Sequence, residues 1–206
     1  MAILKATKNN IIAAAQIVKN GGLVVYPTET VYGLGCNPLN IEAVNRIIAV
    51  KGNRNKPLPV LAATLKDAET VAFISSNAKK LATKFWPGPL TMVFPKKAAL
   101  PDVVTFGLDS VGLRIPDNNV ALQLIRLSGG LLVGSSANKS GELPAQSVEE
   151  LSAELKETVD VVLDGGPAVQ GNPSTVADLT SGKPKLLREG PISLNVILDA
   201  LAFGDK

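Results

Sequence analysis

The sequence predicts an α/β domain with a mixed, twisted β-sheet that carries helices on its faces. Three observations lead to this fold class. Helical and strand patterns alternate along the chain, which is typical of parallel β-α-β units. Two late apolar segments are separated by Ser181-Gly182-Lys183, which indicates an antiparallel hairpin. The length of 206 residues fits a single domain over residues 1–206.

The helices are predicted from apolar periodicity and from capping residues at their starts. Asn10 precedes the first helical pattern, which Gly21-Gly22 ends, and Asn40 precedes the second. Further helices are expected after Thr64, over 76–86, from Asn118 or Asn119 to about Leu127, after Ser147, and after Ser193.

Short apolar runs bounded by turn residues predict the strands. These runs are 23–26, 58–62, 90–94, 111–115, 131–133, 159–163, 176–179 and 185–187. In open α/β sheets, ligands bind beyond the carboxyl ends of strands. The loops at those ends are therefore the expected place of a functional site.

Composition excludes several kinds of chemistry. The chain has no histidine and one cysteine, Cys36, so we expect neither Ser-His-Asp nor Cys-His catalysis, no internal disulfide and no zinc site. No apolar run approaches the roughly 20 residues that span a bilayer, and the N-terminus lacks a signal-peptide pattern. The sequence is therefore expected to be cytoplasmic and not to bind a membrane.

Charge is unevenly distributed along the chain, although the net charge is only +3. Residues 43–66 and 79–97 carry cations and no acid, whereas 142–164 is strongly acidic. Such runs are either solvated surface or a basic face for a polyanion, which means nucleotide phosphates or RNA.

Several loops at strand ends have residues suited to anions. Residues 134–141 read GSSANKSG and residues 171–175 read GNPST, which are either ordinary turns or surfaces of amides and hydroxyls. Lys51, Arg54 and Lys56 lie within six residues of each other and resemble a phosphate clamp, although the chain has no Walker motif.

Two arginines and one polar turn complete the candidate site. Arg114 ends an apolar strand and needs a partner, which is either an internal carboxylate or a ligand carboxylate or phosphate. Arg188 has a similar position. The turn Thr28-Glu29-Thr30 directly follows the strand at 24–26, and it is either a simple strand end or the floor of a ligand site.

Seven motifs, in this order, resemble the YrdC/TsaC family of threonylcarbamoyl-AMP synthases over about residues 8–200. They are PTETVYGLG from Pro27, FWPGPLT from Phe85, GLRIP from Gly112, SANKSG from Ser136, DGG from Asp164, PSTV from Pro173 and LREG from Leu187. The resemblance implies a YrdC-like twisted sheet with a basic concave cleft. It also implies the synthesis of threonylcarbamoyl-AMP and pyrophosphate from L-threonine, bicarbonate and ATP with Mg²⁺. The product would serve N6-threonylcarbamoyladenosine formation on tRNA, through a downstream transferase complex.

The resemblance also assigns site residues. Those implied to bind threonine are Thr30, Arg114, Gly134 and Ser174. Those implied to bind ATP are Lys51, Arg54, Lys56, Ser110, Ser136, Asn138, Pro144 and Arg188. The residues implied to act in catalysis are Lys51, Arg54 and Arg114, and no residue is assigned to a protein-bound metal. Gly33 and Gly35 are expected to let the backbone pass close beneath Thr30.

The chain departs from the family pattern at two positions. Asn53 stands where the family usually has arginine, with Arg54 one residue later, and Leu61 stands where many relatives have histidine. We also expect a single-domain form, without the extra C-terminal domain of the longer relatives. Two alternatives stay open: a non-catalytic RNA-binding or ribosome-maturation factor, and the related domain of hydrogenase-maturation carbamoyltransferases. The second is disfavoured because the accompanying zinc-finger cysteines are missing.

Overall fold

Two mixed β-sheets form the framework of the computed structural model, which describes residues 2–52, 56–181 and 183–202. The first sheet has the order β1 (Ala2–Lys5), β9 (Val161–Asp164), β2 (Val24–Tyr26), β3 (Gly33–Gly35) and β8 (Ser135–Ser136). The second has the order β11 (Lys185–Arg188), β10 (Thr175–Asp178), β5 (Leu90–Pro95), β6 (Ser110–Arg114), β4 (Val60–Ala62) and β7 (Leu131–Val133). The predicted α/β class with mixed strand pairing is confirmed, and the strands divide between two sheets.

At one point the chain passes between the two sheets through a single residue. Strand β7 ends at Val133, Gly134 follows, and β8 begins at Ser135, so residues 131–136 run from the edge of one sheet to the edge of the other. Gly134 donates its amide hydrogen to the carbonyl of Pro59 at 2.8 Å. A Cβ at Gly134 would lie 2.6 Å from Cγ of Leu61, so this junction has no room for a side chain.

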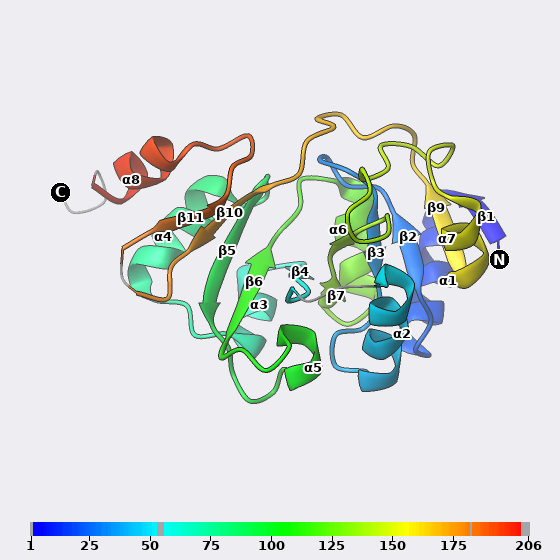
Figure 1. Ribbon diagram of the computed structural model, residues 1–206, viewed down its shortest axis with the longest axis horizontal. Coiled ribbons are helices and arrows are strands. Elements are labelled where there is room, and N and C mark those ends of the chain that lie inside the picture. The colour runs from blue at the N-terminus through cyan, green and yellow to red at the C-terminus, as the bar shows by residue number, and fades with distance from the viewer. Residues whose placement is uncertain (1, 53–55, 182, 203–206) are drawn as a thin grey trace.

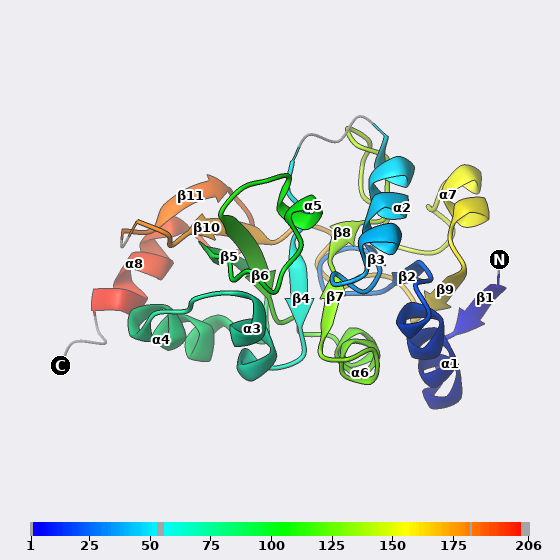
Figure 2. The same cartoon turned by 90° about the horizontal axis from the view of Figure 1, so that it is seen from below.

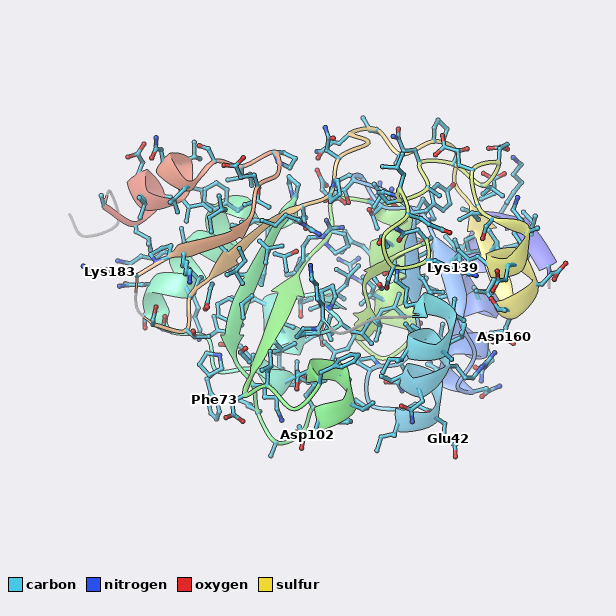
Figure 3. All side chains as sticks on the ribbon, viewed as in Figure 1. Glu42, Phe73, Asp102, Lys139, Asp160 and Lys183 are labelled. Carbon is cyan, nitrogen blue, oxygen red and sulfur yellow. The ribbon has the colours of Figure 1, made fainter. Side chains whose placement is uncertain are left out.

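Helices cover both sides of the sheets. They are α1 (Lys8–Lys19), α2 (Ile41–Lys51), α3 (Leu65–Val71), α4 (Ser76–Phe85), α5 (Asp102–Thr105), α6 (Asn119–Leu127), α7 (Ala153–Thr158) and α8 (Leu194–Ala202). Figures 1 and 2 show α1, α6, α3 and α4 along one side, and α2, α5 and α7 along the other. Charged side chains such as Glu42, Asp102 and Asp160 project outward at the periphery (Figure 3). Within the described ranges, no helix has the length and apolar character needed to cross a membrane.

Buried apolar side chains hold these layers together. One cluster lies between α1, α6 and the first sheet, and it includes Ile11, Val18, Val24, Leu124 and Val161. A larger cluster packs α2, α4 and α8 against the strands of both sheets. The periodicity that predicted the helices reflects this burial.

Most predicted helix starts are confirmed by capping hydrogen bonds. The side chains of Asn40, Thr64 and Asn118 accept backbone amides in the first turns of α2, α3 and α6. The cap of α1 is Thr7 rather than Asn10, so that helix begins earlier than predicted.

The predicted helix after Ser147 is wrong. Glu150, expected in its first turn, instead accepts the amide of Gln146 at 2.7 Å, which keeps this segment in a turn. The helix α7 begins at Ala153, where Ser152 provides the N-terminal cap.

Candidate active site

A cavity of about 550 Å³ lies where the two sheets meet. Its wall includes β5 and β6, the turn after β2, the Gly134 junction and the ends of β10 and β11. The predicted site residues that line it are Thr30, Lys56, Ser110, Arg114, Gly134, Ser136, Ser174 and Arg188. The structure thus brings residues from six separate segments into one site.

The strand β6 supplies one side of this cavity through its alternating geometry. Ser110, Gly112 and Arg114 share a face because side chains alternate along a strand, and all three line the cavity. A Cβ at Gly112 would lie 3.2 Å from Cγ2 of Thr91 on the neighbouring strand. The glycine therefore leaves space above β5 and exposes Thr91 to the cavity.

The turn after β2 is shaped by Thr28 and presents Thr30. Thr28 accepts the amides of Thr30 and Val31, and its hydroxyl donates to the carbonyl of Val31 at 2.6 Å. Since that bond uses its one proton, Thr30 donates in the 2.9 Å contact between the two hydroxyls. Thr30 in turn accepts from Nη1 of Arg114 at 3.1 Å. The turn is therefore both a strand end and a part of the cavity wall.

Arg114 is a buried cation with an incomplete set of partners. Its residue exposure is 5%, and its Nη2 lies 3.6 Å from Oε2 of Glu29, too far for a good hydrogen bond. Nε of Arg114 and both carboxylate oxygens of Glu29 make no hydrogen bond within the described chain. Burial lowers the pKa of Arg114, and the charge of Glu29 opposes this effect. The internal carboxylate predicted as one possible partner of Arg114 is Glu29, but it leaves Nε of Arg114 without a hydrogen bond.

A second arginine is built into a hydroxyl cluster. Arg188 donates from Nε and Nη2 to the carbonyl of Ser174 at 2.9 and 2.8 Å, and from Nη2 to the Ser174 hydroxyl at 3.1 Å. That hydroxyl lies 2.8 Å from Oγ1 of Thr91. Burial lowers the pKa of Arg188, and the positive charge of Arg114 lowers it further.

Thr91 is a cavity residue that the sequence analysis did not single out. It is the last residue of the FWPGPLT motif. The sequence feature that could have identified it is a hydroxyl on the face of strand β5 that borders the cavity. Its burial and its contact with Ser174 make it part of the same polar cluster.

Lys51 lies behind the cavity rather than at its surface. Its exposure is 2%, and its ammonium donates to the carbonyls of Ser136 and Asn138 and to Oδ1 of Asn138. The Ser136 hydroxyl also donates to Oδ1 of Asn138. Lys51, Asn138 and Pro144 are not among the residues that line the described cavity. Arg54 falls outside the described residues.

Gly33 and Gly35 make room for a protein side chain. A Cβ at Gly33 would lie 2.7 Å from Cζ of Tyr26, and one at Gly35 would lie 2.6 Å from the carbonyl oxygen of Val133. The Tyr26 ring thus crosses β3, and its hydroxyl donates to that same carbonyl at 3.0 Å. Both glycines are explained by this packing rather than by close passage of the backbone beneath Thr30.

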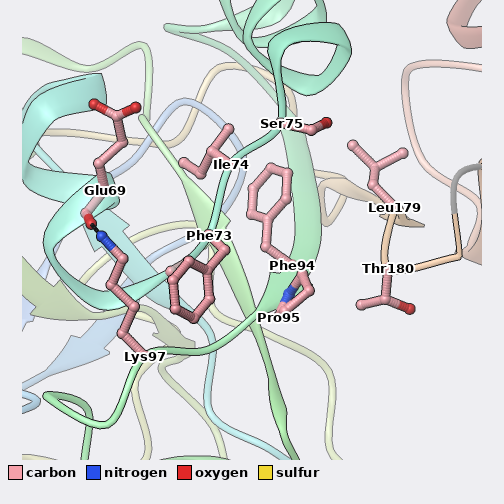
Figure 4. A pocket seen from close by; sticks show the side chains of 10 residues that line it. Glu69, Phe73, Ile74, Ser75, Phe94, Pro95, Lys97, Leu179 and Thr180 are labelled. Carbon is pink, nitrogen blue, oxygen red and sulfur yellow. Dashed lines mark hydrogen bonds between the residues drawn. The ribbon is translucent and has the colours of Figure 1, made fainter.

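A second concavity of about 650 Å³ lies beside α3, α4 and the ends of β5 and β10 (Figure 4). It is mostly apolar, and Phe73 within it is 61% exposed. The ammonium of Lys97 lies 5.3 Å from the centre of the Phe73 ring and donates to the backbone carbonyl of Glu69. None of the predicted site residues lies there.

The fold and the cavity where the sheets meet define a class of protein: an α/β domain whose central site has the charges suited to an anionic small molecule. Three cations, Lys56, Arg114 and Arg188, line that cavity, and its described lining has no aspartate or glutamate. Buried hydroxyls of Thr30, Thr91 and Ser174 accompany them. Guanidinium groups next to hydroxyls are suited to carboxylates and phosphates.

Comparison with known proteins identifies the family. A model of the Sua5/YciO/YrdC family, described as telomere recombination, matches residues 16–190. The chain is 42% identical over 186 residues to the threonylcarbamoyl-AMP synthase of Pyrococcus abyssi, with 89% of this chain and 55% of that protein covered. It is 34% identical over 172 residues to the threonylcarbamoyl-AMP synthase of Cellvibrio japonicus, with 82% of this chain and 91% of that protein covered.

The fold comparison agrees. The structure of P. abyssi Sua5 complexed with L-threonine superposes with a TM-score of 0.93 at 39% identity, covering 97% of this chain and 61% of that one. The chain belongs to the Sua5/YciO/YrdC family, and the resemblance seen in its motifs is confirmed. It spans about half the length of the P. abyssi synthase. Because the matched relatives are named as enzymes, they do not support the alternative of a non-catalytic RNA-binding factor.

Proposed function

We propose that this chain is a threonylcarbamoyl-AMP synthase that uses L-threonine, bicarbonate and ATP. The observation that carries the proposal is Arg114, a buried guanidinium with unused donors that lies beside Thr30 in a cavity whose described lining has no acid. The match to named synthases supports it, as does the similarity to a structure that contains L-threonine.

Threonine binding is assigned to the end of the cavity near Arg114. The guanidinium of Arg114 binds the substrate carboxylate, and the hydroxyls of Thr30 and Ser174 bind polar groups of the substrate. Gly134 lines the same pocket, and its lack of a side chain keeps the substrate close to the junction of the sheets.

ATP occupies the part of the cavity near Arg188. Lys56 and Arg188 offset phosphate charge, while Ser110 and Ser136 contribute hydroxyls to the same part of the cavity. Lys51 contributes through the 136–138 loop that it holds, so Asn138 acts as part of a shaped rim. Pro144 is assigned to the nucleotide site by the family resemblance alone. Arg54 is proposed to reach the triphosphate.

Magnesium enters as part of the MgATP substrate. The described residues contain no cluster of three or more His, Cys, Asp or Glu side chains that could hold a metal ion. Because Mg²⁺ in nucleotide sites is held largely by substrate phosphates and water, we assign the ion to the phosphates of ATP.

The chemistry needs no histidine. The threonine amine and bicarbonate form a carbamate with loss of water, and a carbamate oxygen attacks the α-phosphorus of ATP. The bond from that phosphorus to the bridging oxygen breaks, and pyrophosphate leaves. The three cations of the cavity offset charge on the phosphates.

Pyrophosphate release tests this function. The protein is incubated with MgATP, bicarbonate and each amino acid in turn, and pyrophosphate is measured with and without added bicarbonate. We expect release that depends on both threonine and bicarbonate. Release without threonine, or no release with any amino acid, would contradict the proposal.

The remaining partners follow from the product. A mixed carbamic–phosphoric anhydride is labile, so we place a tRNA threonylcarbamoyl-transferase complex directly downstream and the reaction in the cytoplasm, where tRNA and ATP occur together. The lysines of residues 79–97 are the proposed contact for tRNA or other RNA. RNA affinity that falls steeply with added salt is the expected result.

A further inference from the structure

Glu29 is a buried carboxylate that the proposed chemistry does not use. Its residue exposure is 6%, and its two oxygens accept no hydrogen bond from any described residue. It lies between the two threonines of the turn after β2 but is not part of the cavity lining. Within the described residues, the cation that pairs with it is Arg114, with 3.6 Å between Oε2 and Nη2.

This arrangement is unusual for a structural ion pair. A buried carboxylate is costly unless hydrogen bonds satisfy its oxygens. Here Arg114 makes its one hydrogen bond within the described residues to Thr30 instead. Glu29 therefore acts on its surroundings through charge rather than through hydrogen bonds.

The charge of Glu29 matters because of what the cavity is proposed to bind. Lys56, Arg114 and Arg188 attract the carboxylate of an amino acid but repel its ammonium. A site with only these cations would therefore prefer a plain carboxylate anion to a zwitterion. The negative charge behind Arg114 opposes that preference.

We propose that Glu29 is a specificity-determining residue whose buried charge makes the threonine site select zwitterionic amino acids over simple carboxylate anions. The inference rests on the proposed function, since it takes threonine as the ligand. Glu29 does so from behind the guanidinium, without touching the substrate.

The test compares two ligands that differ only in the ammonium group: L-threonine and (R)-3-hydroxybutanoate. Dissociation constants for both are measured by calorimetry with the wild type, Glu29→Gln and Glu29→Asp. The change in the ratio of the two constants isolates the coupling between the ammonium and the charge of Glu29. Across several ångströms of partly screened interior, we expect that coupling to be about tenfold.

Four results are expected together. The wild type binds threonine at least about tenfold more tightly than the analogue. In Glu29→Gln the preference for threonine over the analogue falls by about tenfold, because the negative charge that favours the ammonium is gone. Glu29→Asp, which keeps the charge, retains most of the wild-type ratio. Glu42→Gln, which removes an acid at the outer end of α2, leaves the ratio unchanged (Figure 3).

Several results would overturn the inference. A parallel loss of affinity for both ligands in Glu29→Gln would indicate a merely structural role. An unchanged ratio would exclude the proposed coupling. A wild type that binds (R)-3-hydroxybutanoate as tightly as threonine would contradict it without any variant, even if Glu29→Gln does not fold. By contrast, a wild type that binds neither ligand would refute the proposed function itself.

Discussion

Lys51 and Arg114 are both buried cations near one cavity, but their surroundings differ. The ammonium of Lys51 has three donors, and three oxygens of the 136–138 segment accept them. The guanidinium of Arg114 has five donors, of which Nη1 is bonded to Thr30 while Nε is unbonded within the described residues. Burial is therefore compensated by the protein at Lys51 and only in part at Arg114.

This difference indicates which of the two cations serves the fold and which is available to a ligand. A buried charge with all its hydrogen bonds satisfied holds its neighbours in place, and removing it leaves several acceptors unpaired. A buried charge with open donors costs free energy in the unliganded protein, and a ligand that pairs with it recovers that cost. On this basis, we propose Arg114 as the ligand-binding cation and Lys51 as a support for the loop beside it.

The largest expected effect is on catalysis by Arg114→Ala. Loss of a charge-paired contact to the threonine carboxylate costs about 2–4 kcal/mol, so kcat/KM for threonine falls well over tenfold. Steady-state pyrophosphate release at limiting threonine measures this, with the exposed Arg126→Ala as the matched control. Near-normal turnover of Arg114→Ala would remove the assignment of Arg114 as the carboxylate anchor.

Lys51→Met is expected to act mainly on stability. It keeps the approximate length of the side chain but leaves the carbonyl oxygens of Ser136 and Asn138 without their ammonium donor. This loss costs about 2–3 kcal/mol in the free energy of unfolding. Urea denaturation measures this cost. The KM for ATP should rise along with it, because the loop loses its support. Unchanged stability together with lost ATP binding would show instead that the ammonium serves the phosphates directly.

Local sequence patterns predicted much of the fold but not this distinction. Apolar runs and capping side chains located most helices and strands, because those signals act over a few neighbouring residues. The cluster of Lys51, Arg54 and Lys56 indicated a phosphate clamp, yet Lys51 turns inward to oxygens contributed by the distant 136–138 segment. The pairing of Glu29 with Arg114 is likewise a contact between distant segments.

Two further differences have the same origin. Strand β3 was not predicted because Gly-Leu-Gly has the composition of a loop, and it becomes a strand through pairing with β2 and β8 beneath the Tyr26 ring. Thr91 could not be predicted as a site residue, because its place in the site depends on the pairing of β5 with β10 and of β10 with β11. In that register Thr91 is opposite Val176, and Val176 is opposite Arg188.

Arg188 is intermediate between Lys51 and Arg114, because the protein satisfies several of its donors although it lines the cavity. The variant Thr91→Val tests the hydroxyl cluster to which Arg188 is bonded. This nearly isosteric change removes one hydroxyl from the cluster with Ser174, which costs about 0.5–1.5 kcal/mol. The Ser174 hydroxyl then loses a partner, so the KM for threonine should rise about two- to tenfold with little change in kcat. Thr105→Val, which removes a buried hydroxyl outside the cavity lining, is the control. An equal effect of the two variants on KM would deny the cluster a role in the site.

The smallest effect is expected at an ion pair whose cation is largely exposed to solvent. Lys5 is largely exposed, and its ammonium lies 2.6 Å from Asp164. The hydrogen bond and charge of Lys5, and then the amide of Gly166, hold the pKa of Asp164 below its ordinary value. A depressed carboxyl pKa stabilises the folded state above the ordinary pKa of about 4, and this stabilisation is lost as the pH falls below it. Urea unfolding of the wild type and Asp164→Asn should therefore differ slightly near neutral pH and converge in acid.

Added salt should shrink the difference in unfolding free energy, because exposed pairs are screened. A difference that persists at low pH and high salt would show that Asp164 acts through backbone geometry rather than through its charge.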